Sequence, residues 1–179
     1  MPADPAIQPG DRIALWVWEE PEMAREYAVD ENGMAVLPKL GPVRVAGLSP
    51  DAVRDSIRVW YATNLTTEAI DVRVLRRIGV RGEVRAPSLY WVDPTLTAQD
   101  VITLAGGLTP DADEDEVELL RDAQRYTLGR GLDRAVALES GDQLLVGRRS
   151  WFSLNAPFVV STSIGVVITA ISIYLAETP

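Results

Sequence analysis

The sequence contains no histidine and no cysteine, and Lys39 is its only lysine. The missing imidazoles exclude serine–histidine triads, histidine acid–base catalysis and histidine metal ligands. The missing thiols exclude disulfides, thiol catalysis and zinc–thiolate sites. An enzyme would have to work with carboxylates, hydroxyls or arginine. The composition therefore predicts a protein that is not an enzyme and that holds no cofactor or metal, with a carboxylate-based enzyme as the least favoured alternative.

Positive charge is also scarce, because 17 basic residues stand against 26 acidic ones and the net charge is −9. Such a chain lacks the basic surface that binds a phosphate backbone, so nucleic acid is not an expected partner. The first residues, MPADPAIQPGD, contain neither a basic stretch nor an apolar run of the kind found in secretion signals. They leave two possibilities open, a cytoplasmic protein or a mature or trimmed form.

The first part of the chain predicts strands around one helix. Residues 8–18 give a Gly-Asp turn and then a strand whose Ile13, Leu15 and Val17 share one face. Residues 25–41 predict a hairpin with its turn at Asn32-Gly33, both at positive φ. One arm of this hairpin carries Tyr27 and Val29, and the other carries Met34 and Val36.

A short strand is expected in 43–47, and a helix follows in 48–65. Ser49 suits the N-cap and Pro50 the first helical position. The helix side chains expected to face the core recur at helical spacing: Val53, Ile57, Trp60 and Tyr61.

The second part begins in the longest alternating segment, residues 69–84. Its apolar members share one parity: Ile70, Val72, Val74, Ile78, Val80 and Val84. We expect two strands to meet near Arg76-Arg77, with a domain boundary there. Further strands are predicted in 88–92, 117–121 and 141–147.

A second helix is expected to start at Thr97, where Asp100 completes a capping-box spacing. It should carry the apolar residues Val101, Ile102 and Leu104 and end at Gly106-Gly107.

The acidic run 111–118 has three alternating aspartates but lacks the mid-loop glycine and the terminal glutamate spacing of a calcium loop. It predicts a solvated loop, with calcium binding as a weak alternative. Four tryptophans are read mainly as core residues, and any that proves exposed is a candidate for stacking on sugars: Trp16, Trp18, Trp60 and Trp91. An internal echo is also present, because PGDRIALWV and SGDQLLVG both place Gly-Asp just before an apolar strand. In isolation this pattern is a turn that leads into a strand.

Taken in order, these segments resemble the bacterial outer-membrane polysaccharide export proteins, the Wza-like family. Three stretches are similar to the polysaccharide-export domain: IQPGDRIALWVWEEPEM, YAVDENGMAVLPKLGPVRVAGLSPDAV and IDVRVL. Two stretches are similar to a β-grasp-type SLBB domain: VRGEVRAPSLYWVDPTLTAQDVITLAGGLTPDA and LESGDQLLVGRR. The resemblance rests on turns at nine residues: Pro9, Gly10, Asp11, Gly82, Glu83, Gly106, Gly107, Gly141 and Asp142.

The resemblance implies an α+β chain with a polysaccharide-export domain in 1–76, an SLBB domain in 77–149 and a membrane-spanning helix in 150–179. It further implies a homo-oligomeric ring in the outer membrane with periplasmic domains, through which capsular polysaccharide or exopolysaccharide leaves the cell. Expected partners are the exported polysaccharide, membrane lipid, and an inner-membrane polysaccharide copolymerase with its associated kinase.

Residues 156–176 contain no charge, and as a helix they would span about 30 Å, the thickness of a bilayer core. One helical face is small or hydroxylated: Ser161, Gly165, Thr169, Ser172 and Ala176. The opposite face is bulky and would contact lipid: Val160, Ile164, Val167, Ile168, Ile171 and Leu175. Small residues at this spacing allow helices to approach closely in lipid.

Three interpretations of the tail are weighed, namely a helix of a pore-lining ring, a simple membrane anchor and a buried core helix. The charges flanking it would, in an inner membrane, leave the folded part in the cytoplasm. The favoured function is a passive, ring-forming export subunit whose C-terminal helices line the exit pore. The alternative is a membrane-tethered binding module whose SLBB domain holds a small soluble ligand.

Overall fold

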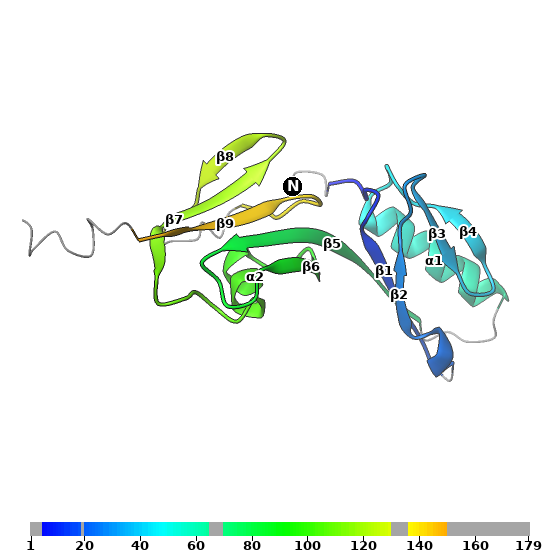
Figure 1. Ribbon diagram of the computed structural model, residues 1–179. Coiled ribbons are helices and arrows are strands. Elements are labelled where there is room, and N and C mark those ends of the chain that lie inside the picture. Colours follow the sequence, from blue (N-terminus) through cyan, green and yellow to red (C-terminus); the bar gives the residue numbers. More distant parts are fainter. Residues whose placement is uncertain (1–4, 19, 65–69, 130–135, 150–179) are drawn as a thin grey trace, which may run out of the picture. The chain divides into compact units, whose positions relative to one another are not determined.

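The computed structural model describes residues 5–18, 20–64, 70–129 and 136–149, and the account that follows concerns these residues (Figure 1). The elements of the first half are β1 (Arg12–Val17), the 3-10 turn η1 (Pro21–Met23), β2 (Arg25–Ala28), β3 (Met34–Leu37), β4 (Gly41–Arg44) and α1 (Pro50–Asn64). Those of the second half are β5 (Ile70–Gly82), β6 (Ser88–Val92), α2 (Ala98–Leu104), β7 (Ala112–Arg121), β8 (Gln124–Thr127) and β9 (Gln143–Arg148).

Strand β5 is the central strand of the sheet and pairs with β1, β6 and β9. Within the described residues, seven strands pair in the order β2-β1-β5-β9-β7-β8, with β6 also on β5, and β3-β4 form a separate two-stranded sheet. The first part of β5 pairs antiparallel with β1, from Ile70 to Leu75. Its later part pairs antiparallel with β6 and parallel with β9. Figure 1 shows β5 running from the neighbourhood of β1 to that of β9.

The expected meeting of two strands near Arg76-Arg77 is wrong, because β5 continues unbroken through both residues for 13 residues. Arg76 occupies the inward parity of the apolar residues and is 3% exposed. Its guanidinium donates a hydrogen bond to the carbonyl of Leu138 at 2.6 Å. A buried charge that finds such a partner does not interrupt the strand.

Two hydrophobic clusters lie on either side of Arg76. The first core takes Val72 and Val74 from β5, together with the inward residues of β1 and α1. The second core takes Ile78 and Val80 from β5, together with residues of β6, α2, β7 and β9. One strand therefore contributes to both cores, which belong to one compact unit, Met1–Gly147.

Helix α1 follows the sequence prediction closely. The hydroxyl of Ser49 accepts the N–H of Ala52 at 3.2 Å, and Pro50 begins the helix. Val53, Ile57 and Tyr61 are buried, and Trp60 is half-buried against the first core. The cap and the helical spacing are both confirmed.

The predicted hairpin of residues 25–41 is wrong in its pairing. Strand β2 pairs with β1, whereas β3 pairs with β4, and only an isolated bridge between Val29 and Ala35 links the two arms. The side chain of Asp30 accepts the N–H groups of Asn32 and Met34, so a side-chain-capped turn replaces the two-residue turn.

In that turn only glycine has a positive φ, +78° at Gly33. In β3, Ala35 and Leu37 are buried, while Val36 is exposed.

Helix α2 has the predicted capping box, in which Thr97 and Asp100 bond each other's backbone N–H groups. Val101 and Ile102 are buried, whereas Leu104 is exposed. The helix is seven residues long, and its inward positions are 98, 101 and 102, so position 104 falls on the far side.

The acidic run is not a loop, because β7 begins at Ala112 and includes most of it. The described residues contain no cluster of acidic side chains that could hold a metal ion. The assignment of Trp16 and Trp18 to the core is also wrong: β1 turns its odd-numbered residues inward, and both indoles are exposed. Trp60 and Trp91 are half-buried.

None of the helices within the described residues is both long enough and apolar enough to cross a bilayer. The predicted membrane-spanning helix, 150–179, lies outside those residues.

Tyr61 provides a test of the first core. Its side chain is fully buried and its hydroxyl donates to the carbonyl of Pro38 at 2.5 Å. Burial, with a smaller contribution from Tyr27, raises the pKa of Tyr61 from 10.0 to about 12. The protonated phenol is the form that the fold favours, so its contribution to stability is complete below pH 10 and is lost as the pH rises through about 12.

We predict that absorbance titration of the phenolate band shows one late-titrating tyrosine, and that Tyr61→Phe removes this step. At neutral pH the variant should lose about 1 kcal/mol of unfolding free energy with the hydrogen bond. A wild-type curve in which every tyrosine titrates near pH 10 would contradict the burial of this group.

Candidate functional site

Two Gly-Asp turns meet at one residue of β5. The turn Gly10-Asp11 precedes β1, and the turn Gly141-Asp142 precedes β9. The N–H of Arg77 donates to a carboxylate oxygen of Asp11 at 3.1 Å, and the N–H of Gly141 donates to the carbonyl of Arg77 at 2.9 Å. Both backbone groups of Arg77 are thus held, one by each turn. We call this arrangement the junction.

The two turns have the same local structure. In the first, the carboxylate of Asp11 accepts the N–H of Gln8 at 2.9 Å, and the N–H of Asp11 donates to the carbonyl of Gln8 at 3.2 Å. In the second, Asp142 and Glu139 make the same pair of bonds at 2.7 and 3.1 Å. The internal echo seen in the sequence is therefore a repeated turn.

Glycine precedes each aspartate for a conformational reason. Gly10 and Gly141 have φ values of +94° and +89°, a region that L-residues with a Cβ rarely adopt. At Gly10 a Cβ would also lie 2.6 Å from the guanidinium of Arg77.

Both aspartates of the junction are 1% exposed, and their oxygens are fully used. The hydroxyl of Ser140 donates to the same oxygen of Asp11 that accepts Arg77, so it links the two turns directly. Asp142 accepts a bidentate contact from Arg121, at 2.8 Å from Nε and 2.6 Å from Nη2. Hydrogen bonding to Asp142, opposed in part by burial, raises the pKa of Arg121. The buried charge of Asp142 is thereby compensated.

Strand β6 adds a third contact to the junction. The indole N–H of Trp91 donates to the carbonyl of Gly10 at 2.9 Å. The guanidinium of Arg12 lies 3.5 Å from the centre of the Trp91 ring and also pairs with Glu26 at 2.7 Å. These contacts bring a residue of β6 onto the turn that begins β1. The two buried carboxylates of the junction accept hydrogen bonds from several segments of the chain. The junction therefore acts as a clamp that holds these segments together.

A second group of motif turns lies at the far end of β5. The N–H and hydroxyl of Thr109 donate to the carbonyl and carboxylate of Glu83 at 3.0 and 2.7 Å. The N–H of Arg85 donates to the carbonyl of Gly107 at 3.1 Å, which ties the turn after β5 to the turn after α2. A Cβ at Gly82 would lie 2.0 Å from the carbonyl oxygen of Val146, so β5 and β9 approach this closely only with glycine there.

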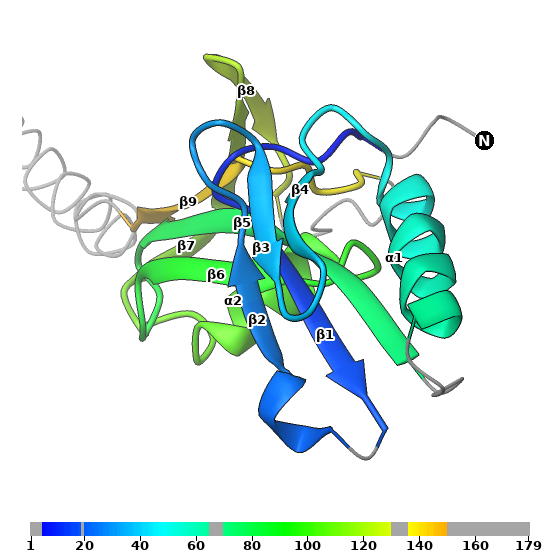
Figure 2. The same cartoon turned by 90° about the vertical axis from the view of Figure 1, so that its right-hand side faces the viewer.

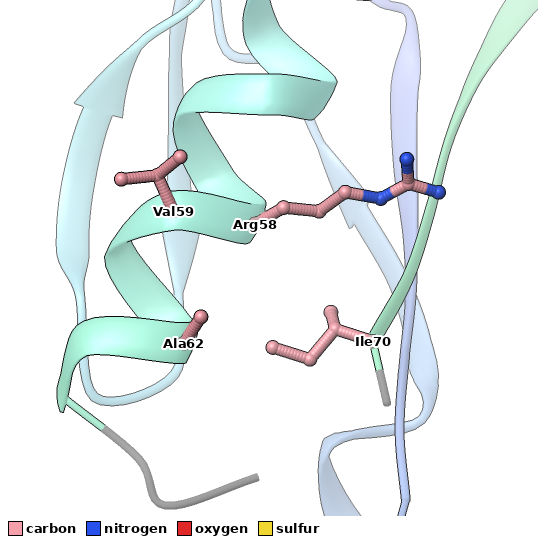
Figure 3. Close-up of a pocket in the computed structure, with 4 residues that line it drawn as sticks. All are labelled: Arg58, Val59, Ala62 and Ile70. Atoms are coloured by element: carbon pink, nitrogen blue, oxygen red, sulfur yellow. The ribbon is translucent and has the colours of Figure 1, made fainter. Parts of the chain in front are cut away.

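The pocket beside α1 does not suggest catalysis. Figure 3 shows Arg58 and Ala62 extending from α1 toward the start of β5, where Ile70 points back at the helix, while Val59 lies on another side. The pocket has a volume of about 400 Å³ and is lined by these four residues, one arginine and three apolar side chains. Such a lining supplies neither a nucleophile nor an acid–base pair.

Of the predicted site residues, the structure brings two groups together. Pro9, Gly10, Asp11, Gly141 and Asp142 belong to the turns of the junction, while Gly82, Glu83, Gly106 and Gly107 meet at the far end of β5. The small stripe and the lipid-facing residues of the tail, positions 160–176, lie outside the described residues.

Two junction residues, Arg121 and Ser140, were not predicted from the sequence. Arg76, next to the junction, was read as a break between strands, although its inward parity in an alternating strand is a signal for its burial. The roles of Arg121 and Ser140 depend on contacts with residues 21 and 129 positions away, which no local pattern indicates.

In comparisons with known proteins, the first and second parts of the chain match two different family models. Residues 1–75 match the family model described as polysaccharide biosynthesis/export protein, and residues 77–133 match the model of the SLBB domain. The observed mixed α/β fold with two domains agrees with these two matches in tandem.

Curated relatives are similar over much of the chain. The EPS I polysaccharide export outer membrane protein EpsA of Ralstonia nicotianae is 27% identical, over 80% of this chain and 47% of the relative. The polysialic acid transport protein KpsD of Escherichia coli is 29% identical, over 60% of this chain and 20% of the relative. The chain thus spans less than half the length of either relative. It belongs to the family of outer-membrane polysaccharide export proteins.

The junction predicts a specific loss of stability in Asp11→Ala. The change leaves the N–H groups of Gln8 and Arg77 without their buried acceptor, so we expect a loss of about 3 kcal/mol in unfolding free energy. Asp55→Ala, on the exposed face of α1, should change it by less than about 0.5 kcal/mol. Urea unfolding followed by tryptophan fluorescence measures both variants. Equal effects at the two positions would show that the Asp11 contacts do not stabilise the fold.

Proposed function

We propose that this chain is a subunit of an outer-membrane channel that exports capsular polysaccharide or exopolysaccharide from the periplasm. The observation that carries the proposal is the tandem match of this chain to an export model and an SLBB model. Its similarity to relatives named for polysaccharide export and polysialic acid transport agrees with it. The protein would act as a passive conduit. The energy for movement would come from polymer synthesis elsewhere.

The division into parts follows the same proposal. Residues 1–76 form the export domain, residues 77–149 the β-grasp-like SLBB domain, and residues 150–179 the membrane-spanning helix. The two cores and the junction between them support this division, because β5 leaves the first core and enters the second at Arg76-Arg77. A subunit whose two halves are clamped in this way presents constant faces to its neighbours, which a closed ring requires.

In the ring, the tail helices would stand side by side and line the exit. The face with Gly165 would contact neighbouring helices or the lumen, and the face with Val167 would contact lipid. Partners would be an inner-membrane polysaccharide copolymerase and its associated kinase, which bring the growing polymer to the periplasmic side.

A second candidate is a membrane-tethered module whose SLBB domain binds a small soluble ligand. The observation in its favour is a pocket of about 350 Å³ lined by residues of β7, β8 and β9, among them Glu118, Arg125 and Thr127. It is a weaker candidate, because the relatives are named for polymer export or transport.

Particle shape separates the two functions. In detergent, the purified full chain should form closed rings visible by negative-stain electron microscopy, with a single oligomeric mass by light scattering. Gly165→Leu should reduce the ring fraction at least about tenfold, because a bulky side chain separates helices that pack through small residues. Val167→Leu, on the opposite face, is the matched control and should assemble like the wild type.

Monomers at all protein concentrations would contradict the ring and favour the tethered module. Rings that form equally with both variants would retain the ring and remove the small stripe as its helix contact.

A further inference from the structure

An exposed pair of tryptophans lies at the end of β1. Trp16 is 46% and Trp18 55% exposed, and their rings meet edge to face with centroids 5.6 Å apart. Two neighbouring indoles left in solvent are unusual, because each would bury a large apolar area in a core. An exposed apolar pair of this kind is typical of a surface that binds a ligand or another macromolecule.

The strand next to β1 places charged groups beside these indoles. In the register of β1 and β5, Trp16 lies opposite Asp71 and Ala14 opposite Arg73. Asp71 and Arg73 form an ion pair of 2.8 Å, and their side chains are 41% and 63% exposed. Figure 2 shows β1 lying between β2 and β5.

A hollow of about 490 Å³ is lined by residues of both strands: Ala14, Leu15, Trp16, Asp71 and Arg73. We call Trp18 together with Ala14, Trp16, Asp71 and Arg73 the indole face.

The composition of the indole face favours a polyhydroxylated ligand over a protein surface. The core of a protein interface is depleted in charged residues. Here the residues opposite Ala14 and Trp16 on the neighbouring strands are Glu26, Arg73 and Asp71, all charged. A sugar ring suits this arrangement, because its C–H face stacks on an indole while its hydroxyls donate to a carboxylate and accept from a guanidinium.

We propose that the indole face binds pyranose rings of the exported polysaccharide. That the ligand is the exported chain rests on the proposed function, whereas the binding chemistry rests on the residues named. The Asp71–Arg73 pair is neutral as a whole, so the face accepts uncharged sugars. Stacking on one or two rings is weak at any single subunit. Contacts of this kind guide a polymer without stopping it.

Saturation-transfer NMR on the full chain tests this site, with cellohexaose as an uncharged probe. The detergent must be sugar-free, for example a zwitterionic amine oxide, because glucoside and maltoside headgroups would compete. Wild-type protein should transfer saturation to the C–H protons of cellohexaose. Trp16→Ala and Trp18→Ala should each weaken binding about tenfold through loss of a stacking surface. Tyr126→Ala, at another exposed aromatic, is the control and should bind like the wild type.

The outcomes separate the site from the proposed function. No transfer to cellohexaose from wild-type rings overturns the sugar site and leaves the export function standing. Transfer that is lost in both tryptophan variants supports the site even if the protein is monomeric, in which case the ring fails alone. Dissociation of rings by Trp16→Ala, with no sugar binding by the wild type, makes the face a subunit contact and overturns the proposal.

Discussion

The buried carboxylate of Asp11 holds the backbone of Arg77, and the rest of the described structure depends on this contact. It lies where the first core ends and the second begins, on the one strand that serves both. A carboxylate removed from water is stable only when donors surround it, and here the donors come from its own turn, from β5 and from the turn before β9. The requirement to satisfy one buried charge therefore fixes three segments of the chain together.

This arrangement suits a protein whose task is to keep its shape. The junction uses its charged groups for internal bonds, and the second such group, Asp142, is paired with Arg121. Groups available for outside contacts lie elsewhere, on the outer face of β1 and β5. A division of this kind, with a bonded interior and a polar, aromatic exterior, agrees with the conduit function proposed above.

Much of the fold could be predicted because its signals are local. The alternation of Ile13, Leu15 and Val17, the cap at Ser49 and the capping box at Thr97 depend on neighbours within a few residues. The errors concern long-range partners. The turn at Asn32-Gly33 has the composition of a hairpin turn, but β2 pairs with β1 and not with the strand that follows the turn. Arg76 was expected to mark a break between strands, yet β5 continues through it, because a carbonyl 62 residues away accepts a hydrogen bond from its guanidinium.

The candidate site shows the same limit. The Gly-Asp turns could be found from sequence because their conformation needs glycine and a short polar acceptor in a fixed order. Their meeting at Arg77 could not be found, since it joins Asp11 to a residue 66 positions later. Trp16 and Trp18 were assigned to the core, although the parity of β1 places them on the opposite side from Leu15.

Hydrogen exchange tests most directly whether the junction makes the two cores one cooperative unit. The slowest amides of the first core and of the second core should be measured by NMR on the full chain. If the clamp at Arg77 couples the cores, both sets exchange with the same opening free energy, that of global unfolding. If one core opens at a clearly lower free energy while the other stays protected, the two halves are independent and the central role of Asp11 is contradicted.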